Sequence, residues 1–143
     1  MEFYLQDSYA TEHLGQLVGR AARGGDVICL TGDLGAGKTL FSRGVATALG
    51  VASSDVNSPT FAIMNIYHGE KLEIHHFDLY RLSREGELED IGFDEYVYGD
   101  EVVRLSLRPR DSAMSSFCGR WNKSADFSYG HSYQSMYCGA VPR

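Results

Sequence analysis

The sequence lacks any run of about 18 apolar residues, so no membrane-spanning helix is expected. Residues 1–7 also lack the basic stretch and the long apolar stretch of a secretory signal peptide, so none is expected there. Cysteine is scarce and odd in number: Cys29, Cys118 and Cys138 are widely spaced and predict neither a zinc site nor a disulfide framework. A reducing cytoplasm fits this cysteine usage best.

Basic residues are few in the first 100 residues. Residues 1–100 hold 16 acidic and 7 basic residues, whereas residues 101–143 hold 3 acidic and 6 basic ones. This acidic balance argues against bulk nucleic-acid binding by the first segment.

The 143 residues are enough for one domain, and 43% hydrophobic residues is a normal share for a globular protein.

One stretch, residues 32–39, organises the rest of the chain. It reads Gly32-Asp33-Leu34-Gly35-Ala36-Gly37-Lys38-Thr39 and fits the phosphate-binding pattern G-x-x-x-x-G-K-[ST] without a mismatch. The apolar residues 27–30 before it predict a buried strand, and residues 40–49 after it predict a helix that Gly50 ends. The alternative is a plain glycine-rich turn, but a strand, a loop and a helix in this order favour the phosphate-binding loop.

The chemistry of this loop follows from its residue types. Glycines let the backbone curl so that successive N–H groups point inward at an anion. The start of the following helix adds unpaired N–H groups and the positive end of the helix dipole. Lys38 would supply a mobile charge for the β- and γ-phosphates, and the Thr39 hydroxyl would bind Mg²⁺.

A helix is expected before this loop, from Asp7 or Ser8 to about Ala22. Asp7 or Ser8 can cap it. Its expected apolar face consists of Leu14, Leu17, Val18 and Ala21. Thr11 lies in its first turn, where a surface or capping role is the simpler interpretation.

Downstream, Ser58-Pro59-Thr60-Phe61 predicts a stiff, hydroxyl-rich turn, which is either an ordinary turn or a segment that senses the γ-phosphate. Residues 62–68 and 72–80 then predict a β-hairpin. The adjacent His75 and His76 should face opposite sides of it, which disfavours a shared metal. Asp78, late in the hairpin, could hold Mg²⁺ or pair with nearby Arg81.

The composition changes after residue 102. Before that point, residues 84–91 predict a short acidic helix that Gly92 ends, and residues 93–98 predict a further helical turn or two. The acids of both form either a solvated face or a docking surface for a basic partner. Residues 103–143 show scattered aromatic residues among serine, glycine and arginine, without clear apolar periodicity. This tail could bind RNA, but disorder or a sequence without a selected fold is the favoured interpretation.

Residues 3–102 resemble the TsaE (YjeE) family of small P-loop ATPases, which act in bacterial tRNA threonylcarbamoyladenosine (t6A) synthesis. The resemblance is carried by five features in order: Thr11, the loop at residues 32–39, Phe41-Ser42-Arg43-Gly44, Ser58-Pro59-Thr60-Phe61, and His76-Phe77-Asp78-Leu79-Tyr80-Arg81-Leu82. The loop alone is common to many families. The last two motifs at this spacing are specific.

The resemblance implies a role for each matching residue. The implied nucleotide-binding residues are Thr11, Asp33, Leu34, Gly35, Ala36, Gly37, Lys38, Thr39 and Leu40. The implied catalytic residues are Lys38, Thr60 in the switch-like segment, and Asp78. Thr39 and Asp78 would hold Mg²⁺. The substrate would be ATP, hydrolysed slowly, and the partners would be TsaB and TsaD, with tRNA contacted only through that complex.

The sequence departs from the family after Glu101-Val102-Val103. The family continues with a strand that ends in Glu-Trp, whose Glu helps to hold Mg²⁺, whereas Arg120 precedes Trp121 here. We therefore expect a P-loop ATPase domain at residues 1–102 and a divergent or frame-altered tail at residues 103–143. The expected fold is α/β and P-loop NTPase-like, with a mainly parallel sheet flanked by helices. Two alternative functions remain: a nucleotide-dependent assembly factor with little hydrolysis, and a small-molecule P-loop kinase.

Overall fold

The computed structural model describes residues 2–59, 62–79, 82, 86–90, 92, 95–96, 102–108, 123–129 and 134–140. Its elements are β1 (Glu2–Leu5), α1 (Ser8–Ala21), β2 (Val27–Gly32), α2 (Lys38–Ala48), the 3₁₀ turn η1 (Ser53–Asp55), β3 (Met64–His68), β4 (Glu73–Asp78), α3 (Gly86–Asp90), β5 (Val102–Arg108), β6 (Lys123–Tyr129) and β7 (Gln134–Ala140). Among these described elements, no helix is long and apolar enough to cross a membrane.

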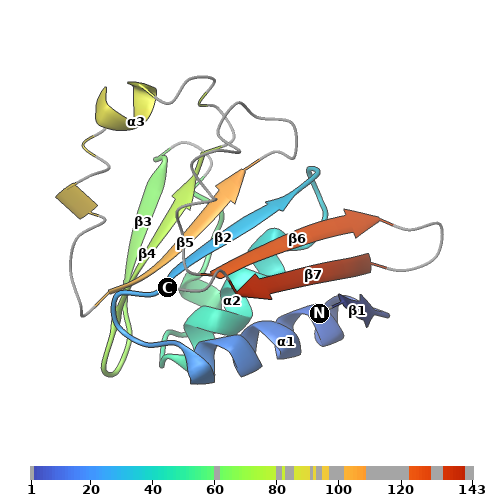
Figure 1. Ribbon diagram of the computed structural model, residues 1–143. Coiled ribbons are helices and arrows are strands. Elements are labelled where there is room, and N and C mark those ends of the chain that lie inside the picture. Colours follow the sequence, from blue (N-terminus) through green and yellow to red (C-terminus); the bar gives the residue numbers. More distant parts are fainter. Residues whose placement is uncertain are drawn as a thin grey trace.

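The strands form one seven-stranded sheet in the order β1-β7-β6-β2-β5-β4-β3 (Figure 1). The central strands β6, β2, β5 and β4 run parallel, whereas β1–β7, β6–β7 and β3–β4 are antiparallel pairs. The α/β, P-loop NTPase-like fold class is therefore confirmed, with a parallel centre and antiparallel edges. Because the parallel strands end at the same edge, the ends of β2 and β4 lie on one side of the sheet.

The last three strands differ from the expectation for the tail. β5, β6 and β7 lie within or overlap residues 103–143, and all three pair inside the same sheet as β2. The expectation of disorder is wrong for these strands, because backbone ladders need no alternating apolar pattern to form hydrogen bonds. The domain boundary at residue 102 and the frame-altered origin of the tail stay predictions.

Helix α1 begins as the sequence predicts. Asp7 is its N-cap, and its carboxylate oxygen Oδ1 accepts a hydrogen bond from the Ala10 amide at 2.7 Å. The buried residues of α1, however, are Thr11, Leu14, Gly15 and Gly19, while Leu17 is 47% exposed. The predicted apolar face was wrong in this respect, because hydrophobic periodicity does not count glycine.

The glycines are buried because α1 and α2 approach each other at backbone distance. A Cβ atom at Gly19 would lie 2.6 Å from the Val45 carbonyl oxygen, and one at Gly44 would overlap the Glu12 carbonyl oxygen. Gly44 belongs to the Phe41-Ser42-Arg43-Gly44 motif, so the structure gives that motif a packing role. The pair of helices covers one face of the sheet (Figure 1).

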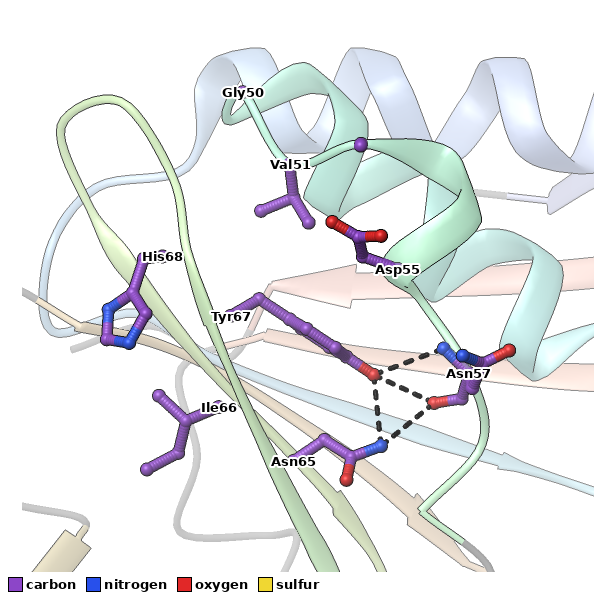
Figure 2. Close-up of a pocket in the computed structure, with 9 residues that line it drawn as sticks. Gly50, Val51, Asp55, Asn57, Asn65, Ile66, Tyr67 and His68 are labelled. Carbon is purple, nitrogen blue, oxygen red and sulfur yellow. Dashed lines mark hydrogen bonds between the residues drawn. The ribbon is translucent and has the colours of Figure 1, made fainter.

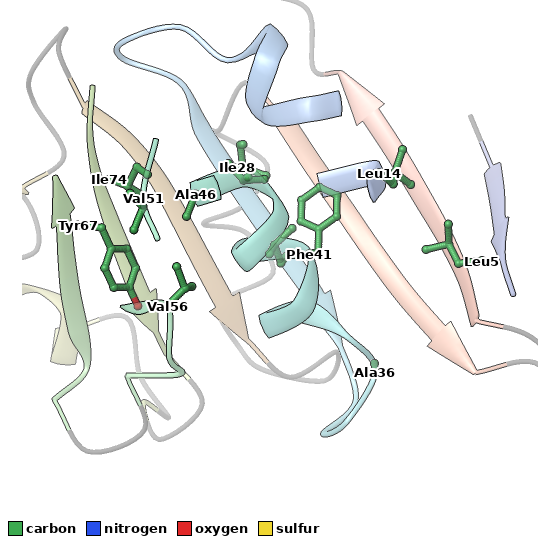
Figure 3. Packing of buried hydrophobic residues seen from close by; sticks show 12 residues of the cluster. Leu5, Leu14, Ile28, Ala36, Phe41, Ala46, Val51, Val56, Tyr67 and Ile74 are labelled. Carbon is green, nitrogen blue, oxygen red and sulfur yellow. The ribbon is translucent and has the colours of Figure 1, made fainter. Parts of the chain in front are cut away.

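The hydrophobic core lies between these helices and the sheet (Figure 3). Phe41 and Val45 of α2 pack there with Ile28 of β2 and Ile74 of β4, each at most 2% exposed. Cys29 in β2 is fully buried and disulfide-bonded, a bond that the spacing of the three cysteines did not predict.

Candidate nucleotide-binding site

The loop between β2 and α2 has the backbone shape that its glycines predict. Gly35 has a φ of 79° and Gly37 a φ of 95°, values that residues with a Cβ rarely adopt. Gly37 is the N-cap of α2, and because glycine has no side chain it leaves the first-turn amides of the helix uncapped by its own residue. Such a helix start is suited to bind an anion.

The Lys38 side chain folds back over this loop. Its ammonium Nζ donates hydrogen bonds to the carbonyl oxygens of Gly32 and Asp33, each at 2.6 Å. Two backbone oxygens therefore hold the positive charge directly over the loop. Lysine at this position of the loop pattern is the residue expected to meet phosphate groups.

The loop is accessible from solvent. Asp33, Leu34 and Gly35 are exposed, with Leu34 at 81%. Gly37, Lys38, Thr39 and Leu40 are half-buried, whereas Gly32 and Ala36 are buried, Ala36 at 2% exposure. The predicted residues 33–40 thus lie together in an accessible loop and the first turn of α2.

Asp78 reaches the same edge of the sheet as the loop. It is the last residue of β4, is paired in register with Leu107 of β5, and Leu107 is paired in register with Leu30 of β2. Two strand spacings put the Asp78 and Leu30 backbones about 10 Å apart. The Asp78 carboxylate oxygen Oδ2 accepts a hydrogen bond from the Ser58 hydroxyl at 3.2 Å. The alternative partner, Arg81, lies outside the described residues.

The structure does not test the predicted roles of Thr11 and Thr60. Thr11 has 0% exposure, and its hydroxyl donates to the Asp7 carbonyl oxygen at 3.2 Å, so it is not a surface threonine. Thr60 lies outside the described residues. The nucleotide contact of Thr11 and the catalytic role of Thr60 stay predictions.

The donors at this edge fit a hard cation. Thr39, the second residue of α2, offers a hydroxyl oxygen, and Asp78 offers a carboxylate. Mg²⁺ prefers oxygen ligands and is commonly held by one or two protein groups together with substrate phosphates. Within the described part of the chain, no group of three or more His, Cys, Asp or Glu residues could hold a metal ion.

The adjacent histidines face opposite sides of the sheet, as predicted. His75 lies 2.6 Å from the Glu73 carboxylate, measured from Nε2 to Oε1. His76 faces the helix side, fully buried, with its Nδ1 at 3.3 Å from the Tyr67 hydroxyl oxygen. Burial lowers the pKa of His76 to about 3, because the charged imidazolium would lose its hydration.

Comparison with known proteins decides the family. The model of the family described as "Threonylcarbamoyl adenosine biosynthesis protein TsaE" matches residues 5–107. The chain belongs to the TsaE family. The match includes the phosphate-binding loop, Ser58 and Asp78, and it continues past residue 102 through most of β5.

Individual TsaE proteins are similar at the sequence level. "tRNA threonylcarbamoyladenosine biosynthesis protein TsaE" of Bacillus subtilis is 47% identical over 92 residues, which cover 64% of this chain and 56% of that protein. The protein of the same name from Treponema pallidum is 44% identical over 100 residues, covering 70% of this chain and 73% of that protein. The chain therefore spans little more than half of the B. subtilis relative.

A solved structure shows the same fold. The crystal structure of Bacillus subtilis YdiB matches with a TM-score of 0.69 at 25% sequence identity, and covers 99% of this chain and 86% of that one. The structural likeness of this TsaE chain therefore extends beyond residue 102, into the segment whose sequence looked divergent.

Sequence reasoning missed one residue beside the site, Tyr67. A groove of about 740 Å³ lies between β3 and the loop after α2, and Tyr67, Asn57 and Asn65 help to line it (Figure 2). The Tyr67 hydroxyl bonds the backbone of Asn57, directly before Ser58. No sequence motif connects residues 57 and 67, so this contact could be found only from the fold.

Proposed function

We propose that this TsaE chain is a P-loop ATPase that binds and slowly hydrolyses ATP with Mg²⁺ in the synthesis of t6A in tRNA. The observation that carries the proposal is the glycine-hinged loop at the start of α2, with the Lys38 ammonium held at 2.6 Å from two loop carbonyl oxygens. The family match supports the pathway, and the geometry of the loop supports the ligand.

Phosphate binding would rest on residues 33–40. The amides of the loop and of the first turn of α2 would surround the phosphate oxygens, and the Lys38 ammonium would exchange its carbonyl partners for the β- and γ-phosphates. The first turn of α1, in which Thr11 is buried, would lie near the base or the ribose. Charge neutralisation of this kind supplies most of the catalysis in phosphoryl transfer.

Asp78 is the described acid best placed to act in hydrolysis. Together with Thr39 it would hold Mg²⁺, which neutralises the charge that develops on the phosphate oxygens. The Ser58 hydroxyl orients the Asp78 carboxylate through the 3.2 Å hydrogen bond. Thr60, two residues after Ser58, would respond to the γ-phosphate. Without the family's Glu-Trp motif, we expect nucleotide binding to be retained and turnover to be weak.

The partners would be proteins of the TsaB and TsaD type, with tRNA contacted only through their complex. The acidic balance of residues 1–100 is suited to protein contacts rather than direct contact with the tRNA backbone. A cytoplasmic location is part of the same proposal and rests on the family.

Three measurements separate this function from the alternatives. Isothermal titration would compare ATP affinity in the parent and in Lys38→Ala, and equal affinity would refute the phosphate-binding assignment. Single-turnover ATP hydrolysis, with and without a TsaB–TsaD pair, would then distinguish an ATPase from an assembly factor that only holds nucleotide. A phosphorylated product from a panel of metabolites would instead indicate a small-molecule kinase.

A further inference from the structure

The segment that leads into Thr60 is attached to the β3–β4 hairpin at several points. Residues 56–59 connect η1 to this segment and lie at the surface except for Val56 and Pro59, which are buried. Their backbone and side chains are bonded by Tyr67 of β3 and Asp78 of β4. Val56 packs in the hydrophobic core, whereas Asn57 and Ser58 are exposed, so these polar contacts position the exposed part of the connection.

Tyr67 makes the first attachment, through both backbone groups of one residue (Figure 2). Its hydroxyl donates to the Asn57 carbonyl oxygen at 2.8 Å and accepts from the Asn57 amide at 3.3 Å. The Asn65 side-chain amide adds a bond to the same carbonyl oxygen at 3.3 Å. Two bonds from one hydroxyl fix the orientation of the Asn57 peptide groups, which a single bond would leave free to rotate.

Core packing and a contact with His76 fix the position of Tyr67. Its ring lies in the core at 7% exposure, and its hydroxyl oxygen lies 3.3 Å from Nδ1 of the fully buried His76. The ring therefore cannot swing away, and the hydroxyl stays at the boundary between core and groove.

Asp78 makes the remaining attachments, at both sides of the segment. Its carboxylate accepts from the Ser58 hydroxyl, next to Asn57, and its backbone amide donates to the Ile63 carbonyl oxygen at 2.8 Å. The Ile63 amide in turn donates to the Pro59 carbonyl oxygen at 3.0 Å. Asn57, Ser58 and Ile63 are thus all bonded to the same hairpin.

We propose that Tyr67 is a positioning residue for ATP hydrolysis: through Asn57 it holds Ser58, and through the Ser58 hydroxyl it holds the Asp78 carboxylate, in one arrangement at the sheet edge that carries the phosphate-binding loop. This inference rests on the proposed ATPase function. Tyr67 acts through Asn57 and Ser58, so its hydroxyl contributes to the rate of the chemical step and leaves the phosphate-binding loop unchanged.

The test compares Tyr67→Phe with the parent and with the matched control Tyr9→Phe. Tyr9 is a 78% exposed tyrosine of α1, so its substitution removes a hydroxyl without touching the hairpin. The first measurement is hydrogen–deuterium exchange of the peptide that spans residues 56–63. In Tyr67→Phe the Asn57 amide should exchange about 10-fold faster, the effect of losing roughly one net hydrogen bond, with no change in Tyr9→Phe.

The second measurement is ATP turnover and ATP affinity with Mg²⁺. We expect kcat of Tyr67→Phe to fall about 10-fold while the Kd for ATP stays within about twofold of the parent, because only the positioned chemical step is affected. Asn65→Ala removes one bond to Asn57 and one to the Tyr67 hydroxyl. It should also lower kcat without changing the Kd for ATP, but by a smaller factor.

The outcomes separate this inference from the proposed function. Faster exchange together with the kcat-only loss supports the positioning role. Unchanged exchange, unchanged kcat, or an equal loss of kcat and ATP affinity overturns it. If the parent itself binds ATP but does not hydrolyse it, the proposed ATPase function fails, and the inference fails with it even where the exchange data show that Tyr67 anchors Asn57.

Discussion

The close approach of α1 and α2 predicts that Gly44→Ala destabilises the protein. A Cβ atom at Gly44 would overlap the Glu12 carbonyl oxygen and would lie 2.9 Å from the Gln16 backbone nitrogen. All of these atoms belong to the backbone of α1, so a rotamer change cannot relieve the contact. The helices would have to separate along the seam that also contains Gly15 and Gly19.

Two opposing effects determine how much Gly44→Ala changes the free energy of unfolding. In an isolated helix, alanine is more favourable than glycine by about 1 kcal/mol. Against this, forcing an extra methyl group into a tightly packed contact typically costs about 1–3 kcal/mol, and more where backbone must move. Since the neighbouring atoms here are all backbone, the second effect wins. We expect a net loss of about 1–2 kcal/mol in the free energy of unfolding, or a fall in Tm of a few degrees.

Urea unfolding, followed by far-ultraviolet circular dichroism, measures this loss. The matched control is Gly86→Ala at the start of α3, where an added Cβ would meet no atom within 4 Å. It should leave the midpoint unchanged or raise it slightly, with the same denaturant slope. A Gly44→Ala protein as stable as the parent, or more stable, would refute the argument that backbone contact determines this position.

Three further predictions concern the site and its surroundings. Lys38→Ala should weaken ATP binding about 10- to 100-fold by titration calorimetry, because charge-assisted hydrogen bonds to phosphate are lost; Arg20→Ala, a surface change on α1, is the control. Asp78→Asn should lower Mg²⁺-dependent turnover while retaining binding of ATP measured without Mg²⁺, and equal turnover would exclude Asp78 from the metal site. The depressed pKa of His76 means that the unfolded chain binds a proton which the folded protein does not between about pH 6.5 and 3. Stability should therefore fall as the pH drops below 6.5, by up to about 1.4 kcal/mol per pH unit, and His76→Gln should flatten this slope in pH-dependent unfolding while exposed His13→Gln should not.

The local features of the fold could be predicted from sequence. The strand before the loop, the helix after it, the Asp7 cap and the β3–β4 hairpin each depend on residues within a few positions of one another. The phosphate-binding loop is of the same kind, since its glycines and Lys38 are contiguous. The strand, the helix, the cap and the hairpin are confirmed, because local sequence decides such structures; phosphate binding by the loop stays a prediction.

The features that could not be predicted depend on contacts distant in sequence. The buried face of α1 is determined by Gly15 and Gly19, which let the backbones of α1 and α2 come close together. A hydrophobicity pattern does not detect such a contact, because glycine has no side chain. The bonds of Tyr67 to Asn57 join two residues that no spacing rule connects. The pairing of β5 between β2 and β4 likewise arises only when the whole sheet assembles.

The place of β5 in the sheet has a consequence for how this part of the protein can vary. The separation between the phosphate-binding loop and Asp78 is determined by backbone pairing on both sides of β5, from Thr31–Arg108 across to Asp78–Leu107. Any sequence that can form an extended, doubly paired strand at residues 102–108 will keep that separation. The chain can therefore change its side chains sharply after residue 102 and still hold Asp78 opposite the loop, whereas a single proline inside β5 would remove a ladder hydrogen bond to one of its two neighbouring strands.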